Sequence, residues 1–552
     1  MLSSAPATAT KMQALGKFSQ HHHLQAFQEH IRVPLSTGAA SPCMRPTPRR
    51  GVRLAASSTE VSESETAAAS SQNASKTALG TCYGTIDFEQ IDEIPVEVEG
   101  KIPEWLKGTL LLNGCGDYTV MKHMFDGFAL LHKWRISEEG VFTSHRFLQT
   151  EAYKHYKATG KLKWKEFAAS PEGSNVFTNI VLFASMGLFG KQATTDNASV
   201  SVIPFGGKVL AVSEPKTAAF EIDMDTMTVV EQMAPDVKGD TVTAHPFITE
   251  QGDIINVASD FAKGYTVYRQ NKSTFECEEV GFVPLQAPFV ASWIHDFPAT
   301  NNYAAIVETP CNINFSALML ETPSEYGMMK WNPDACTFVH LVPLKGEGKV
   351  RTFRCPTFFN YHFGNAFESE DGKRFCFDVA MYKDLKTLVD NRLDVILEGG
   401  NDMAESMLCR IEVPLEGDGG VLKWEPLVKP EMHGKYCDFP TINDRFRGKK
   451  HRYVYMTGAS RPTCNGNCLV KADVEEGTCK VWNRGYLAGE PCFVEAPNPT
   501  SEDDGVVISS CMGPDGTTSL VILDAKTWEE VAVAKMPYGI PARFHGHFFG
   551  QE

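Results

Sequence analysis

The sequence predicts an all-β fold in which short strands close on themselves, as in a propeller or a barrel. Strand signals are many and short, whereas helical patterns are few. No linker-like break occurs in residues 80–552, so these residues are expected to form one domain. About 470 residues would suit seven blades of four strands each, although no internal repeat fixes the number of blades.

The expected strands are enriched in β-branched and aromatic residues and are bounded by Gly, Pro, Asp or Asn. In chain order they are GTLLLNG (108–114), VSVIPFGGKVLAVSE (200–214), DIINVAS (253–259), YAAIVETP (303–310), RFCFDVAMY (374–382), RYVYMTG (452–458), GVVISSCM (505–512) and TSLVILD (518–524). One helix is expected over residues 383–399, where aliphatic residues recur at helical spacing.

The first 58 residues differ from the rest of the chain. They are rich in Ser, Ala, Thr and Pro, carry seven Lys and Arg against one acid, and lack the apolar core of a secretory signal. This composition is typical of an organelle transit peptide, and the alternative is a plain disordered tail. Residues 59–79, a low-complexity stretch, are expected to be a disordered linker that precedes the domain 80–552.

The charge and hydropathy of the chain limit its partners. The net charge is −16, and it is more negative without the basic leader, so no nucleic-acid partner is expected. No run of eighteen apolar residues occurs, which excludes a spanning helix by sequence. The apolar stretch NIVLFASMGLFGK (179–191) is too short to span but suits a peripheral membrane contact. A buried core helix is the alternative for this stretch.

Four histidines share a local character. Each is surrounded by aromatic and small residues: His245 in TVTAHPFI, His295 in ASWIHDFPATNNY, His362 in FFNYHFGNAFE and His545 in RFHGHFF. Their wide separation excludes a local helical metal motif and suits strands that each send one side chain to a central axis. Any one of them alone is explained as well by a core histidine.

Three acids lie in similarly apolar, strand-like settings. They are Glu214 in VLAVSEP, Asp438 in CDFPTIN and Glu490 in LAGEPCFV. A metal-bound imidazole usually donates its second N–H to a carboxylate or a carbonyl, so these acids are candidate partners of the histidines. A Lys or Arg partner is the alternative for each acid.

These residues resemble the carotenoid cleavage dioxygenase family. The resemblance covers about residues 84–550 and rests on GTLLLNGCGDYTVMKHMFDGFALL, the four histidine contexts, GEPCFVE and EDDGVVIS. It implies a seven-bladed β-propeller with a helical loop cap over an axial iron(II) site. The implied ligands are His245, His295, His362 and His545, supported by Glu214, Asp438 and Glu490. The implied reaction adds O2 across one C=C bond of an apolar polyene and gives two carbonyl products.

Further stretches resemble the carlactone synthase branch of this family. They are KHMFDGFALL, TEAYKHYKATGKLKWKEF, GKKHRYVYMTGASRP and AKMPYGIPARFHG. This resemblance implies conversion of a 9-cis apocarotenal to carlactone in the chloroplast, in agreement with a transit peptide. The alternatives are another carotenoid- or stilbene-cleaving oxygenase of the same family, or a propeller binding scaffold that has lost activity.

Two positions depart from the family pattern. Asp438 stands where most members have Glu. The resemblance leaves two interpretations open: Asp is a mark of the carlactone synthase branch, or the shorter side chain makes a longer or water-mediated contact to a histidine. Ala542-Arg543-Phe544 replaces the usual Gly or Tyr-Gly. This replacement is expected to alter the cavity wall, but it does not affect the choice of His545 as the candidate ligand. His547 shares the strand parity of His545. The choice between them rests on the FHG context, and His547 is expected to pack or to support the site.

Overall fold

The computed structural model describes residues 76–551, apart from residues 176, 178–193, 315–316, 318–324 and 347. The expected transit peptide (1–58), nearly all of the expected linker (59–79) and the apolar stretch 179–191 lie outside the described residues. The expectations for the transit peptide, for linker residues 59–75 and for the apolar stretch therefore stay predictions. Residues 76–79 are helical, with Ala78 and Leu79 buried, so the expected linker was wrong there and the ordered domain begins before residue 80.

The described residues form eight antiparallel sheets, of which seven are the blades of a propeller and the eighth is a two-stranded insertion. Blade 1 consists, in spatial order, of β1 (Gln90–Pro95), β6 (Gly140–Phe147), β5 (Phe128–Ser137), β3 (Gly108–Leu112) and β33 (Gly546–Gly550), with β4 (Cys115–Asp117) beside β5. Blade 2 consists of β7 (Ser201–Phe205), β8 (Lys208–Val212), β9 (Ala219–Asp223) and β10 (Thr228–Gln232). Blade 3 consists of β11 (Thr241–Val242), β12 (Phe247–Ile248), β13 (Ile254–Asp260), β14 (Gly264–Gln270) and β15 (Cys277–Pro284).

The remaining blades complete the ring. Blade 4 consists of β16 (Tyr303–Glu308), β19 (Thr337–Pro343) and β20 (Arg351–Cys355), and the pair β17 (Cys311–Ile313) and β18 (Met329–Trp331) is inserted between its strands. Blade 5 consists of β21 (Phe359–Glu368), β22 (Arg374–Tyr382), β23 (Ser406–Pro414) and β24 (Trp424–Pro426). Blade 6 consists of β25 (Asp438–Thr441), β26 (Tyr453–Gly458), β27 (Cys468–Asp473) and β28 (Thr478–Trp482). Blade 7 consists of β29 (Cys492–Glu495), β30 (Gly505–Met512), β31 (Thr518–Asp524), β32 (Glu530–Lys535) and β2 (Glu97–Gly100).

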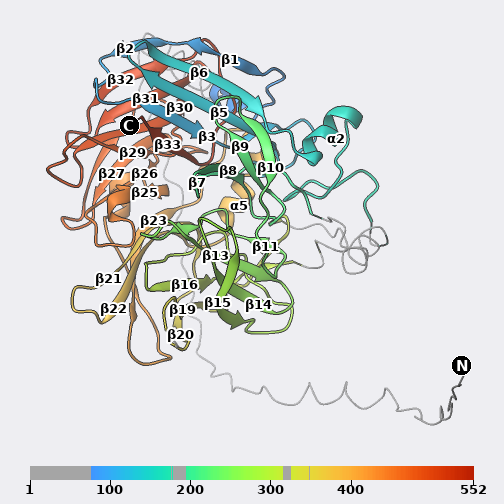
Figure 1. Ribbon diagram of the computed structural model, residues 1–552, viewed down its shortest axis with the longest axis vertical. Helices are drawn as coiled ribbons and strands as arrows, with labels where there is room; N and C mark the ends of the chain where they lie inside the picture. The colour runs from blue at the N-terminus through green and yellow to red at the C-terminus, as the bar shows by residue number, and fades with distance from the viewer. Residues whose placement is uncertain are drawn as a thin grey trace, which may run out of the picture. The chain divides into compact units, whose positions relative to one another are not determined.

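The two ends of the domain close the ring twice (Figure 1). The C-terminal strand β33 pairs with β3 in blade 1, where Leu111 lies opposite His547. The N-terminal strand β2 pairs with β32 in blade 7, where Val98 lies opposite Ala534. Each closing blade therefore contains strands from both ends of the domain, and the sequence prediction of a closed all-β propeller is confirmed.

Strand composition follows position within a blade. In the inner part of a blade, as in β31 (TSLVILD), every residue except the last is buried, because neighbouring blades cover both faces. The outermost strand β10 (TVVEQ) has no buried residue and carries polar side chains that protect the exposed edge. The short strands expected from β-branched runs all occur at or near the predicted positions.

A glycine pair makes the first tight hairpin of blade 2. Gly206 and Gly207, between β7 and β8, have φ angles of 59° and 79°, which two-residue hairpins of this twist require. A Cβ atom at Gly206 would lie 2.4 Å from the carbonyl oxygen of Lys272. Only glycine satisfies both the backbone angle and the close approach.

Helices are few among the described residues, and one differs from its prediction. The expected helix 383–399 is two short helices, α5 (Lys386–Asp390) and α6 (Leu393–Ile396). The break occurs at Arg392, whose backbone is extended. The backbone there pairs with the segment around His123, and the N–H of Leu393 donates to Lys122 O at 3.0 Å. Tertiary hydrogen bonds thus replace helical ones.

Helical residues also occur at 76–82, before the first strand. The helix α2 (Glu151–Thr159) begins after Thr150, whose side chain accepts the N–H of Tyr153, and it ends at Gly160, with φ 70°. Two 3₁₀ turns, η1 (Pro430–His433) and η2 (Asp444–Phe446), flank β25.

Asn113 joins the end of β3 to the C-terminal tail. This fully buried side chain donates to the carbonyls of Ala198 at 2.7 Å and Ser201 at 3.2 Å. Its backbone N–H donates to His545 O at 2.9 Å, and its carbonyl accepts the N–H of Phe544 at 2.7 Å. One residue therefore fixes blade 1, blade 2 and the tail together.

Replacing Asn113 with Ala should lower the free energy of unfolding by about 2 kcal/mol, because buried carbonyls lose their donors. The shift in the urea unfolding midpoint measures the loss. Asn332→Ala, at an exposed position, is the control and should leave the midpoint unchanged. Equal midpoints for the two variants would contradict the role of Asn113.

Candidate metal centre

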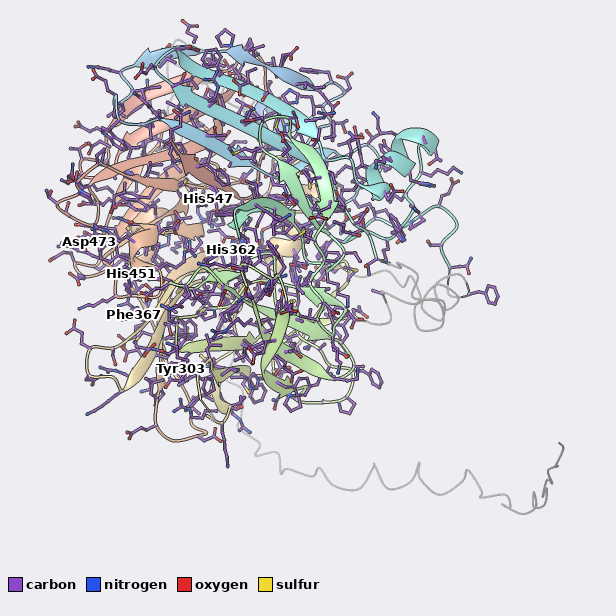
Figure 2. The ribbon with its side chains drawn as sticks, viewed as in Figure 1. Tyr303, His362, Phe367, His451, Asp473 and His547 are labelled. Atoms are coloured by element: carbon purple, nitrogen blue, oxygen red, sulfur yellow. The ribbon has the colours of Figure 1, made fainter. Side chains whose placement is uncertain are left out.

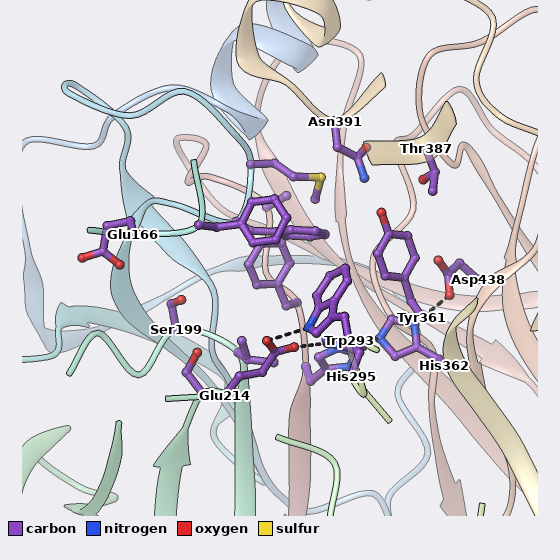
Figure 3. A pocket seen from close by; sticks show the side chains of 18 of the residues that line it. Glu166, Ser199, Glu214, Trp293, His295, Tyr361, His362, Thr387, Asn391 and Asp438 are labelled. Carbon is purple, nitrogen blue, oxygen red and sulfur yellow. Dashed lines mark hydrogen bonds and ion pairs between the residues drawn. The ribbon is translucent and has the colours of Figure 1, made fainter. Parts of the chain in front are cut away.

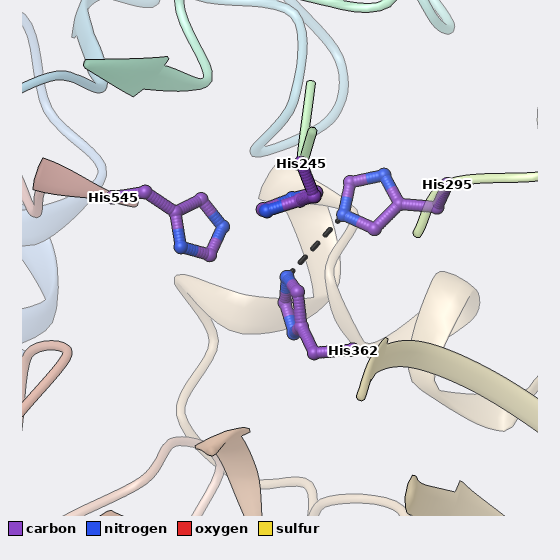
Figure 4. A group of neighbouring side chains, drawn as sticks. All are labelled: His245, His295, His362 and His545. Carbon is purple, nitrogen blue, oxygen red and sulfur yellow. Dashed lines mark hydrogen bonds between the residues drawn. The ribbon is translucent and has the colours of Figure 1, made fainter. Parts of the chain in front are cut away.

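The structure brings the four predicted histidines together at the inner ends of four blades (Figure 4). His245 lies between β11 and β12, His295 lies before β16, His362 lies within β21, and His545 directly precedes β33. One nitrogen from each ring lies within 4.8 Å of the others. In the wider view, His362 lies near the middle of the blades, whereas Asp473 lies toward their edge (Figure 2).

The rings meet at steep angles rather than in stacks. The His245 ring lies 4.4 Å from the His545 ring, 4.8 Å from the His295 ring and 5.1 Å from the His362 ring, measured between centroids. The corresponding interplanar angles are 86°, 63° and 80°. Such an arrangement lets several ring nitrogens point at one common centre.

Each of the three predicted acids contacts one of these histidines. Glu214 accepts the Nδ1 proton of His295 at 2.5 Å, Asp438 that of His362 at 2.7 Å, and Glu490 that of His545 at 2.7 Å. Hydrogen bonding at Nδ1 fixes the tautomer and leaves the Nε2 lone pair free. The alternative of a Lys or Arg partner does not hold at these positions.

The donor set fits a divalent transition-metal ion. The Nε2 atoms of His295 and His362 lie 3.3 Å apart, and with both Nδ1 protons committed to acids this contact joins two lone pairs. The Nε2 atom of His245 is buried and has no hydrogen-bond partner among the described residues. Lone pairs brought together in this way are relieved by a shared cation, and imidazole suits iron, copper, nickel and zinc.

The pKa values of His245 and His362 agree with a ligand role, whereas that of His295 is shifted the other way by its acid. Burial, and then the neighbouring histidines, lower the pKa of His245 well below its ordinary value. Burial also lowers the pKa of His362 to about 4, so both rings are neutral at neutral pH. Burial opposes the proton on His295 too, but the hydrogen bond and charge of Glu214 outweigh it and raise the pKa.

The second oxygen of each acid is also held. Trp293 Nε1 donates to Glu214 Oε2 at 2.8 Å, and the Tyr382 hydroxyl donates to Asp438 Oδ2 at 2.7 Å. The backbone N–H of Gly546 donates to Glu490 Oε2 at 3.1 Å. Sequence reasoning missed Trp293 and Tyr382. Trp293 lies in the same motif as His295, two residues before it, so the sequence offered a local signal for Trp293 but none for Tyr382.

Asp438 contacts His362 directly, so the expected lengthening or water-mediated contact was wrong. The pairing of β25 with β26 is irregular between Asp438 and Thr441, and Phe439 has a φ of 51°. Such a bulge re-aims a side chain, and here the Asp438 carboxylate reaches His362 Nδ1 at 2.7 Å. Burial would raise the pKa of Asp438, but His362 and Tyr382 outweigh it and lower the pKa, so the carboxylate is ionised.

Arg543 explains the second departure from the family pattern. It is 7% exposed and donates to the carbonyls of Leu130 at 2.6 Å and Pro541 at 3.0 Å, and to that of Cys115. Burial lowers the pKa of Arg543 to about 10, so it stays charged at neutral pH. This side chain ties the tail to blade 1 two residues before His545. His547 lies outside the histidine group and packs 4.8 Å from the Phe549 ring.

A cavity of about 820 Å³ opens beside the histidines, and His295, His362 and His545 line it (Figure 3). Its aromatic lining includes Trp293 and Tyr361, and Phe125, Phe167 and Phe544 add further aromatic surface. A largely apolar cavity of this size suits a hydrophobic ligand. Among the described residues, no helix is long and apolar enough to cross a membrane.

Comparison with known proteins places the chain in a family. The family model described as retinal pigment epithelial membrane protein matches residues 83–550. "Carotenoid cleavage dioxygenase 8, chloroplastic" of Arabidopsis thaliana is 34% identical over 473 residues, which cover 81% of this chain and 82% of that protein. The rice homolog B of that protein is 33% identical over 468 residues, covering 82% and 81%. Human beta,beta-carotene 15,15'-dioxygenase is 27% identical over 521 residues, covering 84% and 94%.

A solved structure supports the fold independently. The crystal structure of cobalt-substituted ACO from Synechocystis superposes with a TM-score of 0.72 at 23% identity, covering 87% of this chain and 99% of that one. The family match covers nearly all of the propeller, and relatives above 30% identity span most of the chain. The chain therefore belongs to the retinal pigment epithelial membrane protein family, the carotenoid oxygenases, and is a dioxygenase of that family.

Proposed function

We propose that the protein is an iron(II)-dependent enzyme that oxidatively cleaves one C=C bond of a carotenoid or an apocarotenoid. The observation that carries this proposal is the group of four histidines, three of them held by acids, at the wall of a largely apolar cavity. Four histidines without a cysteine favour iron over the usual closed or three-ligand zinc sites.

The histidines, the acids and the aromatic cavity residues have different roles in the proposed reaction. His245, His295, His362 and His545 would hold the metal, and Glu214, Asp438 and Glu490 keep three of these rings in one tautomer and orientation. When bound, iron(II) supplies the redox chemistry that lets O2 react with an alkene. The aromatic cavity wall excludes water and places a polyene against the histidines.

We further infer that the substrate is a 9-cis apocarotenal and the product carlactone. Support comes from two plant relatives named carotenoid cleavage dioxygenase 8, at 34% and 33% identity, and from the motifs of the carlactone synthase branch. Both relatives are named chloroplastic, and the basic, Ser-rich residues 1–58 fit import into the same compartment. A peripheral membrane contact through residues 179–191 would give access to a membrane-dissolved substrate.

The two histidines of the tail should differ sharply in metal binding. His545→Ala should lose most of the iron and all cleavage activity, whereas the matched control His547→Ala should keep about one iron per chain. Metal analysis of the purified variants is the measurement. Retention of iron by His545→Ala, or its loss from His547→Ala alone, would reverse the assignment.

Asp438→Asn should weaken iron binding about 10–100-fold, because the amide cannot accept the Nδ1 proton of His362 with the same strength. Titration with iron under anaerobic conditions measures the affinity. Asp438→Glu restores the acid usual in the family and should stay within a few-fold of the parent. An unchanged affinity in Asp438→Asn would show that this carboxylate does not support the metal.

Product analysis tests the substrate. The iron-loaded protein is incubated with β-carotene, all-trans apo-10′-carotenal and 9-cis apo-10′-carotenal, and the products are identified by mass. We expect carlactone from the 9-cis substrate alone. Efficient cleavage of β-carotene without carlactone would leave the enzyme a carotenoid oxygenase but would remove it from the carlactone synthase branch.

A further inference from the structure

Three polar side chains gather on the wall of the cavity that α5 and β21 form. They are Tyr361, in β21, Thr387, in α5, and Asn391, directly after α5, and all three line the cavity that the histidines border. The Tyr361 hydroxyl points toward Asn391 and Thr387 and away from His295 and His362 (Figure 3).

The Tyr361 hydroxyl is a buried polar group without a partner. The residue is 3% exposed, and its hydroxyl has no hydrogen bond among the described residues. Burial raises the pKa of Tyr361, and the side chains of Thr387 and Asn391 oppose that rise as hydrogen-bonding groups beside the hydroxyl, although neither reaches the geometry of a full hydrogen bond with it. A buried hydroxyl left in this state costs stability, which a ligand oxygen would restore.

The wall is held in place by backbone contacts, so its side chains are positioned in advance. The N–H of Asn391 donates to Thr387 O at 3.1 Å, and its carbonyl accepts the N–H of Met124 at 3.0 Å. A ring nitrogen of His123 contacts Leu388 O at 2.9 Å. These hydrogen bonds fix the backbone of α5 and of the residue that follows it. The side chains of Thr387 and Asn391 line the cavity.

The charge around this wall selects a neutral ligand group. Asp390, the α5 acid that also lines the cavity, is committed to Lys386 Nζ at 2.7 Å, to Asn401 Nδ2 at 2.7 Å and to the N–H of Ala404 at 2.8 Å. Lys386 is taken by that contact, and Arg392 is paired with Asp394. Among the described residues of α5 and its flanks, these two cations are thus already paired with acids, whereas a carbonyl or hydroxyl oxygen meets two hydroxyls and one amide.

We propose that Tyr361, Thr387 and Asn391 form a subsite that hydrogen-bonds a neutral oxygen function, a carbonyl or a hydroxyl group, of a polyene in the cavity. This proposal rests on the proposed function, because it concerns the ligand of the same cavity. The Tyr361 ring lies 6.0 Å from the His295 ring and its hydroxyl lies on the far side. Anchoring the oxygen there sets which double bond of the chain reaches the histidines.

Two ligands that differ only in the oxygen test the subsite. They are apo-10′-carotenal and the hydrocarbon of equal polyene length in which a methyl group replaces the aldehyde. Their dissociation constants are measured by tryptophan fluorescence quenching on the iron-loaded full chain without O2, so that binding is read without turnover. The parent protein should bind the aldehyde about 3–10-fold more tightly than the hydrocarbon.

Tyr361→Phe and Asn391→Leu should each bring this ratio toward one. The matched control is Tyr83→Phe, which removes a hydroxyl from the same cavity whose partner is the Asn465 amide, and which should change both ligands alike. Tyr361→Phe should also keep or raise the melting temperature, because it deletes an unpaired buried hydroxyl. With O2 present, Tyr361→Phe should raise KM for the aldehyde more than it lowers kcat and should give cleavage at more than one bond.

Each outcome decides between the two proposals. If the iron-loaded protein cleaves no polyene, the proposed function fails, and the binding ratio still reports on the subsite. If cleavage proceeds and the ratio is the same in the parent, Tyr361→Phe and Tyr83→Phe, the subsite is wrong and the proposed function stands. An ordered water that satisfies the three side chains in place of a ligand would give this second result.

Discussion

The hydrogen bond between a histidine Nδ1 and a carboxylate from another blade is the interaction on which the centre depends. Glu214 of blade 2 holds His295 of blade 4, Asp438 of blade 6 holds His362 of blade 5, and Glu490 of blade 7 holds His545 of blade 1. With His245 from blade 3, every blade contributes one residue. The propeller is thus a scaffold that brings one residue from each of its seven blades to a single place.

The same arrangement makes the site depend on ring closure. His545 is placed by the pairing of β33 with β3, by the backbone of Asn113 and by Arg543. Since the C-terminal strand belongs to the first blade, the last histidine reaches the others only when the ring is shut. Contacts that stabilise the closed ring therefore also complete the group of histidines. This explains why the C-terminal segment carries buried aromatic and cationic side chains.

Much of this architecture could be predicted from local sequence, and the remainder could not for a physical reason. Strands and candidate histidines are marked by their immediate neighbours, so β31 or the context of His362 is readable in a short window. The pairing of each acid with its histidine joins residues 81, 76 and 55 positions apart, and no local pattern encodes it. The break of the expected helix 383–399 likewise arises from contacts with the segment around His123, which helical periodicity does not sense.

Asp438 shows that a substitution must be judged together with its backbone. Sequence alone indicated that a shorter acid leaves a longer contact, because it assumes that the strand keeps its place. The irregular pairing of β25 shows that the strand does not keep a regular register at this position. The Asp438 carboxylate therefore hydrogen-bonds both His362 and the Tyr382 hydroxyl. The departure therefore gives no reason to expect a scaffold that has lost its activity.

The buried polar groups near the cavity fall into two kinds, and the difference bears on function. Asn113 and Arg543 have every polar side-chain atom hydrogen-bonded to the protein, and they build the site. The Tyr361 hydroxyl and His245 Nε2 have no partner, and both belong to the centre or its cavity. Unpaired atoms also occur away from it, as at Ser144, so lack of a partner alone is not a sign of a ligand. Where such an atom lies at a cavity among other polar groups without partners, a bound ligand is the simplest source of the missing hydrogen bond. The free protein is then less stable by the cost of the unpaired group, and ligands that supply the hydrogen bond are bound in preference to those that do not.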